Sequence, residues 1–374
     1  MLFINYRSFS ATNAGFSETV IQLLEKVPEK EQVLTISIFG LVTENDYLSN
    51  LQIIRQTAQH VFGRIPLFNY LAQSPKNEHS LIAEVGYLHD SISTLAVSYH
   101  DLAQGRYLSI ETDQFSALLV EGLMSDNIQQ SIGEQSVDVF NKLQQILQAS
   151  SMTAQNIVRQ WNYIGHITGV ENNHQNYQEF NNERARFYAT AKWGNGYPAA
   201  TGISMDIRAV IVSLIAVKYH DTTRIFPVNN SLQFAAHCYS KTVLGDSEKK
   251  ETPKFERAKL IVSRNSACCF ISGTAAILGE KSLGNDDVKN QTVHTIALIR
   301  HLISAENLKV NGIDFSGDLK IVHLRVYVKE TDDFEVVRSV LETELPGINA
   351  FYVCAGVCRE ELLVEIEGIA ITES

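Results

Sequence analysis

The sequence contains little of what would mark a secreted or membrane protein. It has five cysteines among 374 residues, an odd and sparse set that fits a reducing compartment better than a disulfide scaffold. No apolar run approaches the roughly 18 residues that a membrane-spanning helix needs. The first residues, MLFINYRSFSATNAGF, lack the basic end and long apolar core of a signal peptide. We therefore expect a cytoplasmic protein that does not associate with a membrane.

Positive charge and metal-ligand patterns are also scarce. Lys and Arg total 31 against 42 Asp and Glu, which gives a net charge of -11 and argues against a general nucleic-acid binder. A small anionic ligand would need a local group of Arg or Lys. Cys354 and Cys358 belong to no CxxC pair, so structural zinc is not expected. No phosphate-binding loop is found either, and we predict a protein without metal or cofactor.

What the sequence does contain is an internal repeat. In residues 116–164 and again in 267–328, a strand ends at a glycine (Gly122 or Gly273), an amphipathic helix follows, and a further strand closes the segment. Both copies continue with a second helix and two more strands. A shortened third copy begins near the N-terminus with the strand VLTISIFG.

Strands that alternate with helices predict an α+β fold in which each unit is a sheet with helices on one face. We predict three tandem units packed about an internal pseudo-threefold axis: a truncated unit (1–99), a middle unit (100–243) and a C-terminal unit (254–374). The polar loop 244–253 is a plausible linker. Because such a chain has less need to trimerise, we expect a monomer or a small homo-oligomer.

The segment 350–371, AFYVCAGVCREELLVEIEGIAI, is the most informative stretch. It predicts two strands joined by a polar turn, and the second strand carries Glu365 and Glu367 on one face. A carboxylate on an otherwise apolar strand is costly unless it is paired or used. Cys358 lies seven residues before Glu365 across the turn, so the two side chains could be neighbours.

The last unit resembles the RidA (YjgF) superfamily. The residues that carry the resemblance are FISGTAAI, RVYVKETDDFEVV and above all CREELLVEIEGIA. A chain of this length that also carries WNYI, YQEFNNERARFY and TPKFERA is similar to the chorismatases of that superfamily. The resemblance implies a cofactor-free enzyme whose small-molecule substrate is chorismate. It would release pyruvate together with 3-hydroxybenzoate, 4-hydroxybenzoate or a dihydroxycyclohexadiene carboxylate.

Within this resemblance, Glu365 and Cys358 are the predicted catalytic residues. Cleavage of the enol ether requires a general acid that is still protonated near neutral pH. Burial on an apolar strand raises a carboxyl pKa, and a second carboxylate such as Glu367 raises it further. A cysteine at the place of Cys358 accompanies chorismatases that form 3-hydroxybenzoate.

The predicted substrate-binding residues have several origins. Arg184 matches the chorismatase helix pattern, and Tyr239 falls where the family has a tyrosine near the substrate. Arg325 lies on a strand face that we expect to point towards the site. Arginine binds carboxylates bidentately, which suits a dicarboxylate substrate. Gly273, which allows close approach of the backbone, and Glu367 complete the predicted set.

Two other interpretations remain open. An imine or enamine deaminase of the same fold resembles this chain, but such enzymes use an arginine in the strand before the signature glutamate, where Ala200 and Cys354 stand here. The third interpretation is a non-catalytic ligand-binding protein, in which the two glutamates and Cys358 only pack or accept hydrogen bonds. Because the middle copy has Ile211 opposite Glu365 and the first has a lone Glu84, we predict one working site, at the edge of the last unit.

Overall fold

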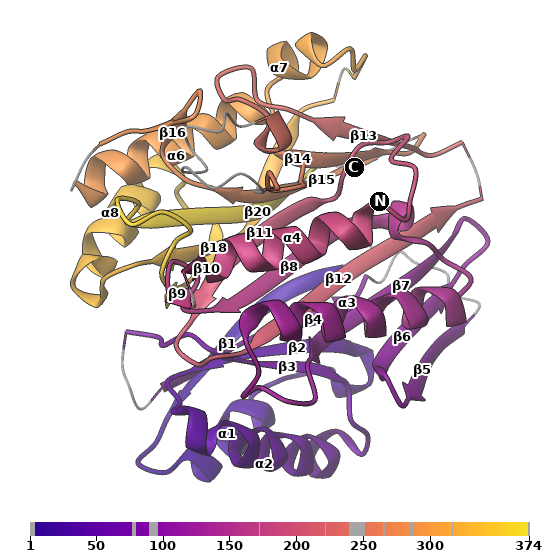
Figure 1. Ribbon diagram of the computed structural model, residues 1–374, viewed down its shortest axis with the longest axis vertical. Helices are drawn as coiled ribbons and strands as arrows, with labels where there is room; N and C mark the ends of the chain where they lie inside the picture. The colour runs from indigo at the N-terminus through magenta and orange to yellow at the C-terminus, as the bar shows by residue number, and fades with distance from the viewer. Residues whose placement is uncertain are drawn as a thin grey trace.

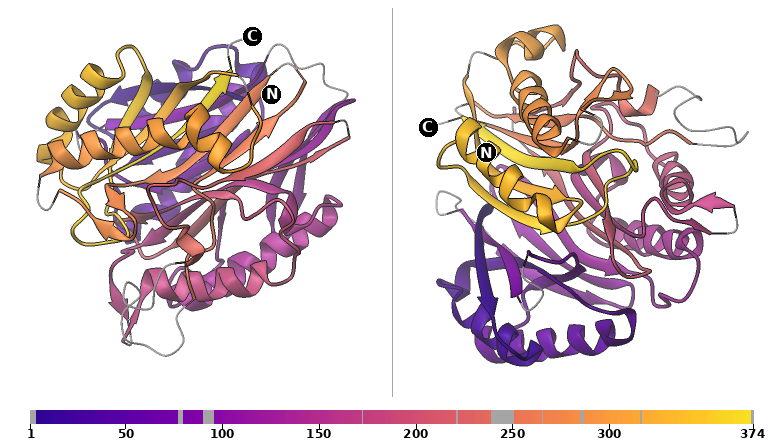
Figure 2. Two further views of the ribbon diagram at one scale, coloured as in Figure 1. Left: turned by 90° about the horizontal axis from the view of Figure 1, so that it is seen from above. Right: turned by 90° about the vertical axis from the view of Figure 1, so that its left-hand side faces the viewer.

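The protein is built on three large β-sheets, which pack with their inner faces together and carry their helices on the outside (Figures 1 and 2). The computed structural model describes residues 4–76, 80–89, 96–171, 173–220, 222–238, 251–264, 266–284, 287–315 and 317–372. No helix in these ranges is long and apolar enough to cross a membrane. The inner faces form one continuous apolar core that all three sheets share.

The first sheet has the strand order β1-β4-β2-β3. Helices α1 and α2 cover its outer face (Figure 1). Its strands are β1 (Ile4–Thr12), β2 (Val33–Gly40), β3 (Leu67–Ala72) and β4 (Ser80–Leu88), and its helices are α1 (Phe16–Glu25) and α2 (Glu44–Phe62). Helix α2 begins at the cap Thr43, whose side chain accepts from Asp46 N, and ends at Gly63 in the left-handed conformation.

The second sheet has the order β11-β8-β12-β7-β6-β5. Its strands are β5 (Ala96–Leu102), β6 (Gly105–Glu111), β7 (Phe115–Met124), β8 (Ile157–Gly165), β11 (Ala199–Met205) and β12 (Val210–Tyr219). Its helices are α3 (Ile132–Ala149) and α4 (Asn176–Tyr188), and the short strands β9 (Val170–Glu171) and β10 (His174–Gln175) precede α4. A capping box between Ser131 and Glu134 starts α3.

The third sheet has the order β13-β14-β15-β20-β18-β19. Its strands are β13 (Arg224–Val228), β14 (Ala258–Val262), β15 (Ala267–Thr274), β18 (Leu319–Val328), β19 (Asn349–Cys354) and β20 (Val364–Thr372). Its helices are α6 (Val288–Leu302), α7 (Ala305–Val310) and α8 (Phe334–Glu344), and β16 (Ile277–Leu278) pairs with β17 (Lys281–Ser282).

The helices and strands expected from the repeats are confirmed. The first sheet also contains β1 and α1, which the sequence pattern did not indicate, and the second contains the hairpin β5–β6. The two strands of segment 350–371 are not neighbours, because β18 lies between β19 and β20. Strand β13, from the stretch before the polar loop, pairs with β14 and so belongs to the third sheet.

Backbone hydrogen bonds link the sheets in a closed ring. The ends of β3, β11 and β19 meet where the three sheets converge, and one backbone hydrogen bond joins each pair of sheets. The second sheet donates Asp206 N to Ala72 O at 2.9 Å and Ser204 N to Gly356 O at 3.0 Å, and the third donates Cys354 N to Ser74 O at 2.7 Å. A link between every pair of sheets is consistent with an internal pseudo-threefold arrangement.

Strand register gives the correspondence between the three units. In each unit the inner face of one strand (β4, β12 or β20) pairs with the inner face of its antiparallel neighbour (β2, β8 or β18). One equivalent set is Ile82 with Phe39, Ile211 with Tyr163, and Glu365 with Tyr327; the next is Glu84 with Ser37, Ser213 with Trp161, and Glu367 with Arg325. Glu84 is therefore the counterpart of Glu367, and the third unit alone has an acid at the position of Glu365.

Candidate active site

A cleft lies between each pair of neighbouring sheets, and the three clefts are equivalent by the register above. Cleft A lies between β11 and α4 of the second sheet and β15 and β20 of the third. Cleft B lies between β3 and α2 of the first sheet and β7 and α3 of the second. Cleft C lies between α8 and β19 of the third sheet and β1 and β4 of the first.

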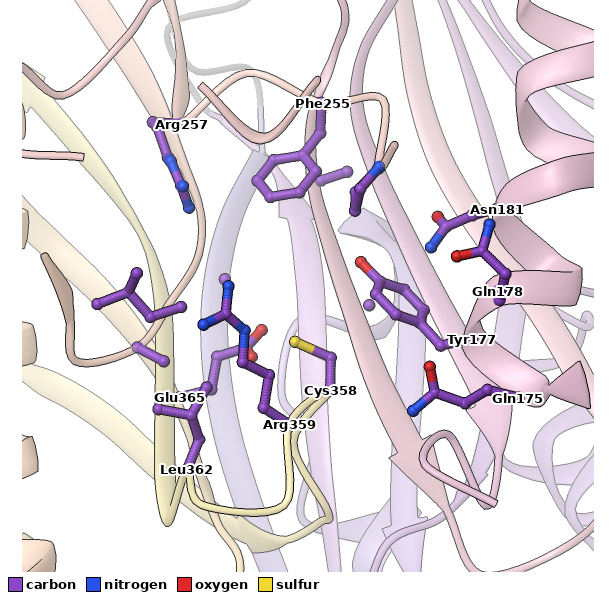
Figure 3. A pocket seen from close by; sticks show the side chains of 16 residues that line it. Gln175, Tyr177, Gln178, Asn181, Phe255, Arg257, Cys358, Arg359, Leu362 and Glu365 are labelled. Carbon is purple, nitrogen blue, oxygen red and sulfur yellow. The ribbon is translucent and has the colours of Figure 1, made fainter. Parts of the chain in front are cut away.

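Cleft A is lined by a carboxyl group, a thiol, a phenol and two guanidinium groups. Its empty space is about 830 Å³, part of it open to solvent. Figure 3 shows Glu365, Cys358 and Arg359 on one side and Tyr177 with Asn181 on the other, across the space. The two sides come from different sheets, so neither unit could form the site alone.

Glu365 is the acid of cleft A. Its side chain is 5 % exposed, and no hydrogen bond from the described residues reaches its carboxyl group. Burial and, after it, the negative charge of Glu367 raise the pKa of Glu365 to about 8, against the opposing effects of Arg159 and Arg257. At neutral pH the group is therefore mainly a neutral carboxylic acid that faces the cleft and can donate a proton.

Gly273 allows that acid to occupy its place. The Glu365 carboxyl lies against the Cα of Gly273, where a Cβ would overlap Oε1. The amide N–H of Gly273 donates to Thr201 Oγ1 at 3.0 Å, which fixes the β15 edge to β11. Gly273 therefore contributes to the site by close approach of its backbone, which leaves room for the Glu365 carboxyl group.

Gly273→Ala is expected to lower by about 10²-fold the kcat of any reaction in which Glu365 donates its proton. The added methyl group displaces the acid by roughly an ångström from its working position. The backbone tolerates alanine here, since Gly273 does not have a positive φ. Gly194→Ala is the matched control, because Gly194 has open space around it and no positive φ. Steady-state kinetics and thermal unfolding of both variants test this. Full activity in Gly273→Ala would show that the position of Glu365 does not matter.

Cys358 and Tyr177 both line this space (Figure 3). Burial and, after it, the neighbouring Glu365 raise the pKa of the Cys358 thiol to about 12. Burial also raises the pKa of Tyr177, and Cys358 adds to it. Both groups are protonated at neutral pH, so the cleft offers an S–H and an O–H beside the carboxylic acid. The expected proximity of Cys358 to Glu365 is confirmed.

Two arginines line cleft A that the sequence did not single out. Arg257 donates to Phe234 O at 2.7 Å, and its guanidinium lies 5.6 Å from the centre of the Phe255 ring. Arg359 donates to Glu280 O at 2.9 Å and to Ser282 Oγ at 3.2 Å. These contacts orient two cations beside the acid, and a guanidinium binds carboxylates well. The signals were the motifs TPKFERA and CREE, which contain these residues.

Arg184 lies behind the wall of the cleft and does not line it. It is 1 % exposed and donates to Asn181 Oδ1 at 2.5 Å. The described residues place no carboxylate at ion-pair distance from it. Because its acceptor oxygen is occupied, the Asn181 amide presents its NH₂ group to Tyr177 and the cleft. The placement favours an indirect role for Arg184, through Asn181, over the predicted direct contact with a substrate.

Glu367 and Arg325 lie outside cleft A, on the inner face where the three sheets meet. Glu367 accepts hydrogen bonds from Trp161 Nε1 at 2.7 Å, from Arg159 Nη2 at 2.7 Å and from Thr201. Arg325 pairs with Glu84 and donates to Tyr163 Oη at 2.6 Å.

The two residues are also joined to each other, since Arg325 Nη1 lies 3.3 Å from Glu367 Oε1. Most of their polar atoms bond to these partners, which favours a structural role over their predicted role in substrate binding. Tyr239, also predicted to bind substrate, lies outside the described residues.

The three clefts differ in the residue at one equivalent position of their floor. Gly202 lies on the floor of cleft A, and the register of β3 and β19 places Tyr70 and Tyr352 at the same position in clefts B and C. A Cβ at Gly202 would approach Tyr177 to 3.1 Å. The missing side chain therefore gives the Tyr177 ring its room.

Comparison with known proteins finds similarity to chorismatases, to a 3-hydroxybenzoate synthase and to the L-PSP family. The family model "Chorismatase FkbO/Hyg5-like, N-terminal" matches residues 97–216, and the "Endoribonuclease L-PSP" model matches residues 260–372. A 3-hydroxybenzoate synthase of Streptomyces hygroscopicus is 30 % identical over 227 residues, which are 58 % of this chain and 63 % of the relative. A chorismatase of the same organism is 32 % identical over 219 residues, 57 % of this chain and 61 % of the relative.

The match thus spans about three fifths of the length of these relatives. A crystal structure of a chorismatase shares the fold over nearly the whole chain: it superposes with a TM-score of 0.71 at 20 % identity and covers 99 % of both chains.

Proposed function

Because the chain belongs to the chorismatase family of the RidA-like superfamily, we propose that it cleaves the enolpyruvyl ether of chorismate in cleft A. The observation that carries this proposal is Glu365, a buried carboxyl group that remains protonated at neutral pH and faces a cleft lined by Arg257 and Arg359. Vinyl ethers are cleaved through protonation of carbon, and this step needs such an acid.

The reaction begins when Glu365 donates its proton to the terminal methylene carbon of the enolpyruvyl group. The carbon–carbon double bond becomes a methyl group, and an oxocarbenium ion forms at the ether carbon. The Glu365 carboxylate that results balances this cation in a poorly hydrated site, where the attraction is strong. General acid catalysis of this kind contributes about 10²- to 10⁴-fold.

Two outcomes follow from that cation. If water adds at the ether carbon, the ring oxygen leaves as a hydroxyl group, and the products are pyruvate and a dihydroxycyclohexadiene carboxylate. If the ring then loses one hydroxyl group and one hydrogen as water, a hydroxybenzoate and pyruvate result with no net consumption of water. The substrate has two carboxylates, and Arg257 and Arg359 are the cations that line the cleft within the described residues.

Cys358 supports 3-hydroxybenzoate as the ring product. Its protonated thiol faces the space beside Glu365 and Tyr177, where it can donate a proton to the leaving hydroxyl group and, as the thiolate, accept the ring hydrogen. The relative at 30 % identity named 3-hydroxybenzoate synthase agrees with this product. The thiol would thus determine whether the ring becomes aromatic after the ether has been cleaved.

Cys358→Ala is expected to shift the product ratio from 3-hydroxybenzoate towards the non-aromatic diol, with pyruvate release reduced less than threefold. Chromatographic separation of the ring products measures this. Cys354→Ala is the matched control, because its thiol donates to Lys329 O outside the cleft. An unchanged product ratio in Cys358→Ala would limit the cysteine to packing.

The direct test of the proposed function is to incubate the purified protein with chorismate, without metal or nucleotide, and to follow pyruvate and aromatic products. Release of pyruvate well above the spontaneous rate is the expected result. If no pyruvate forms, and ammonia is released from an amino-acid-derived imine, the protein is a deaminase of the same fold. If neither forms, the chorismatase proposal fails in favour of a ligand-binding protein.

A further inference from the structure

Cleft B is a second cavity of comparable size, and the proposed reaction does not use it. It encloses about 1030 Å³ between β3 and α2 of the first sheet and β7 and α3 of the second. The register places Ile211 where cleft A has Glu365. Cleft B therefore has the position of an active site without its acid, which favours binding over catalysis.

A bonded polar group lies on the inner side of cleft B, in the same pattern as on the inner side of cleft A. Gly122 N donates to Ser213 Oγ at 3.2 Å, and Asn69 Nδ2 donates to the same oxygen at 3.2 Å. On the inner side of cleft A the equivalent residues are Gly273, Glu367 and Thr201, which also form a bonded group. Cleft C lacks this pattern, because Phe351 stands at the place of Asn69.

Asn69 has a buried acceptor that no described residue satisfies. The residue is 1 % exposed, and its Oδ1 has no hydrogen-bond partner. A Cβ on Gly122 would lie 3.4 Å from this oxygen and 2.8 Å from Phe68 O, so the glycine allows β7 to approach β3 closely beside the acceptor. A buried acceptor without a partner costs free energy, on the order of 1–3 kcal/mol. A ligand that donates a hydrogen bond from cleft B would remove that cost.

Glu121 adds a second group that can bind a hydroxyl. It precedes Gly122 on β7 and lines the cleft. Burial raises the pKa of Glu121 to about 7, against the opposing effects of Ser213 and Arg325. Close to neutral pH it both donates and accepts, so a hydroxyl group placed between it and Asn69 could make two hydrogen bonds.

The outer part of the cleft offers an aromatic surface and a cation. The Arg55 guanidinium lies 5.8 Å from the centre of the Phe68 ring, and no described carboxylate lies at ion-pair distance from it. The other two cations of the cleft have carboxylate partners: Arg106 with Asp101, and Lys142 with Asp126 and Asp138. Arg55 is therefore the cation available to a ligand carboxylate.

We propose that cleft B binds a small ring compound that bears a hydroxyl group and a carboxylate. The hydroxyl donates to Asn69 on the floor, the ring lies against Phe68, and the carboxylate meets Arg55. This inference rests on the residues of cleft B, although hydroxybenzoates, the products under the proposed function, belong to the same chemical class. A ligand at this site would be held at a distance from the acid of cleft A.

Isothermal titration of the full-length protein with 3-hydroxybenzoate tests the proposal without any turnover. Asn69→Leu removes the acceptor at similar volume, and Ala103→Trp places a bulky ring on the exposed hairpin that borders the cleft. Each variant should lose one equivalent of bound 3-hydroxybenzoate, or weaken it at least tenfold. Benzoate, which lacks the hydroxyl group, should bind the same site at least tenfold more weakly than 3-hydroxybenzoate.

Binding that is identical in wild type, Asn69→Leu and Ala103→Trp would overturn the proposal. Each variant is a control for the other. Asn69→Leu alters the floor of the cleft, whereas Ala103 is exposed and its replacement leaves the floor intact. Failure of the proposed function is a separate result: it would appear as absent pyruvate release from chorismate and would leave this titration unaffected. Asn69→Leu should also retain the wild-type rate of pyruvate release, since the residue does not line cleft A.

Discussion

Glu365→Gln is expected to lower kcat for pyruvate release from chorismate by at least about 10³-fold, because glutamine keeps the shape of the side chain but cannot transfer a proton to carbon. The fold should be retained, since no hydrogen bond from the described residues depends on this carboxyl. Stopped assays for pyruvate together with circular dichroism measure both properties. Activity within tenfold of wild type would remove Glu365 from the catalytic role.

The pH dependence of kcat/KM provides a second test of the same group. A general acid works while it is protonated, and the pKa of Glu365 is raised to about 8. The rate should therefore be constant near neutrality and fall tenfold per pH unit above about pH 8. The residual activity of Glu365→Gln should lack this alkaline limb. A limb that persists in the variant would belong to another group.

The stability of this variant should depend on pH in a characteristic way. The Glu365 pKa is about 8 in the folded protein, against 4.5 for an unperturbed glutamate, so between these pH values the native state binds a proton that the unfolded state has lost. The free energy of unfolding of wild type therefore falls as the pH rises from about 4.5 to about 8. Glu365→Gln avoids that loss and should become more stable relative to wild type across this range.

Glu367→Gln, two residues further along the same strand face, is expected to show the opposite result. It removes the carboxylate that pairs with Arg159 and Arg325 on the inner face. Breaking a buried ion pair by removing one partner costs about 3–5 kcal/mol of unfolding free energy. Catalysis per folded molecule should change far less than in Glu365→Gln.

Chemical unfolding of the two variants side by side separates the roles, because they differ from wild type by the same chemical change on the same strand. Loss of stability in Glu365→Gln with none in Glu367→Gln would reverse both assignments. A double variant in which Arg159 is also replaced, by methionine, should recover part of the loss, since the uncompensated buried charge is then removed.

Much of this architecture is predictable from the sequence because it depends on local periodicity. The helical spacing in α3 and α6 and the alternation in β20 set the elements, and the repetition of their order indicated three equivalent units. Glu365 and Cys358 were found together because only seven residues separate them. Predicting that these two side chains are close required no knowledge of distant parts of the chain.

Other parts of the site depend on how the units pack. Strand alternation shows that Arg325 and Glu367 share faces with their neighbours, but not whether a face meets a cleft or another sheet. Tyr177 and Asn181 reach cleft A from the second sheet, roughly 180 residues before Glu365 in the chain. Such contacts are set by long-range packing, which neither propensity nor spacing specifies.

The ring of backbone hydrogen bonds that joins the ends of β3, β11 and β19 has a consequence for how the protein can change. In a trimer of identical subunits each substitution is present three times, and assembly depends on concentration. Here the three sheets are parts of one chain, so the sites survive dilution and each position can vary by itself. A costly residue such as the buried acid is needed once, and the remaining two clefts are free to acquire separate roles.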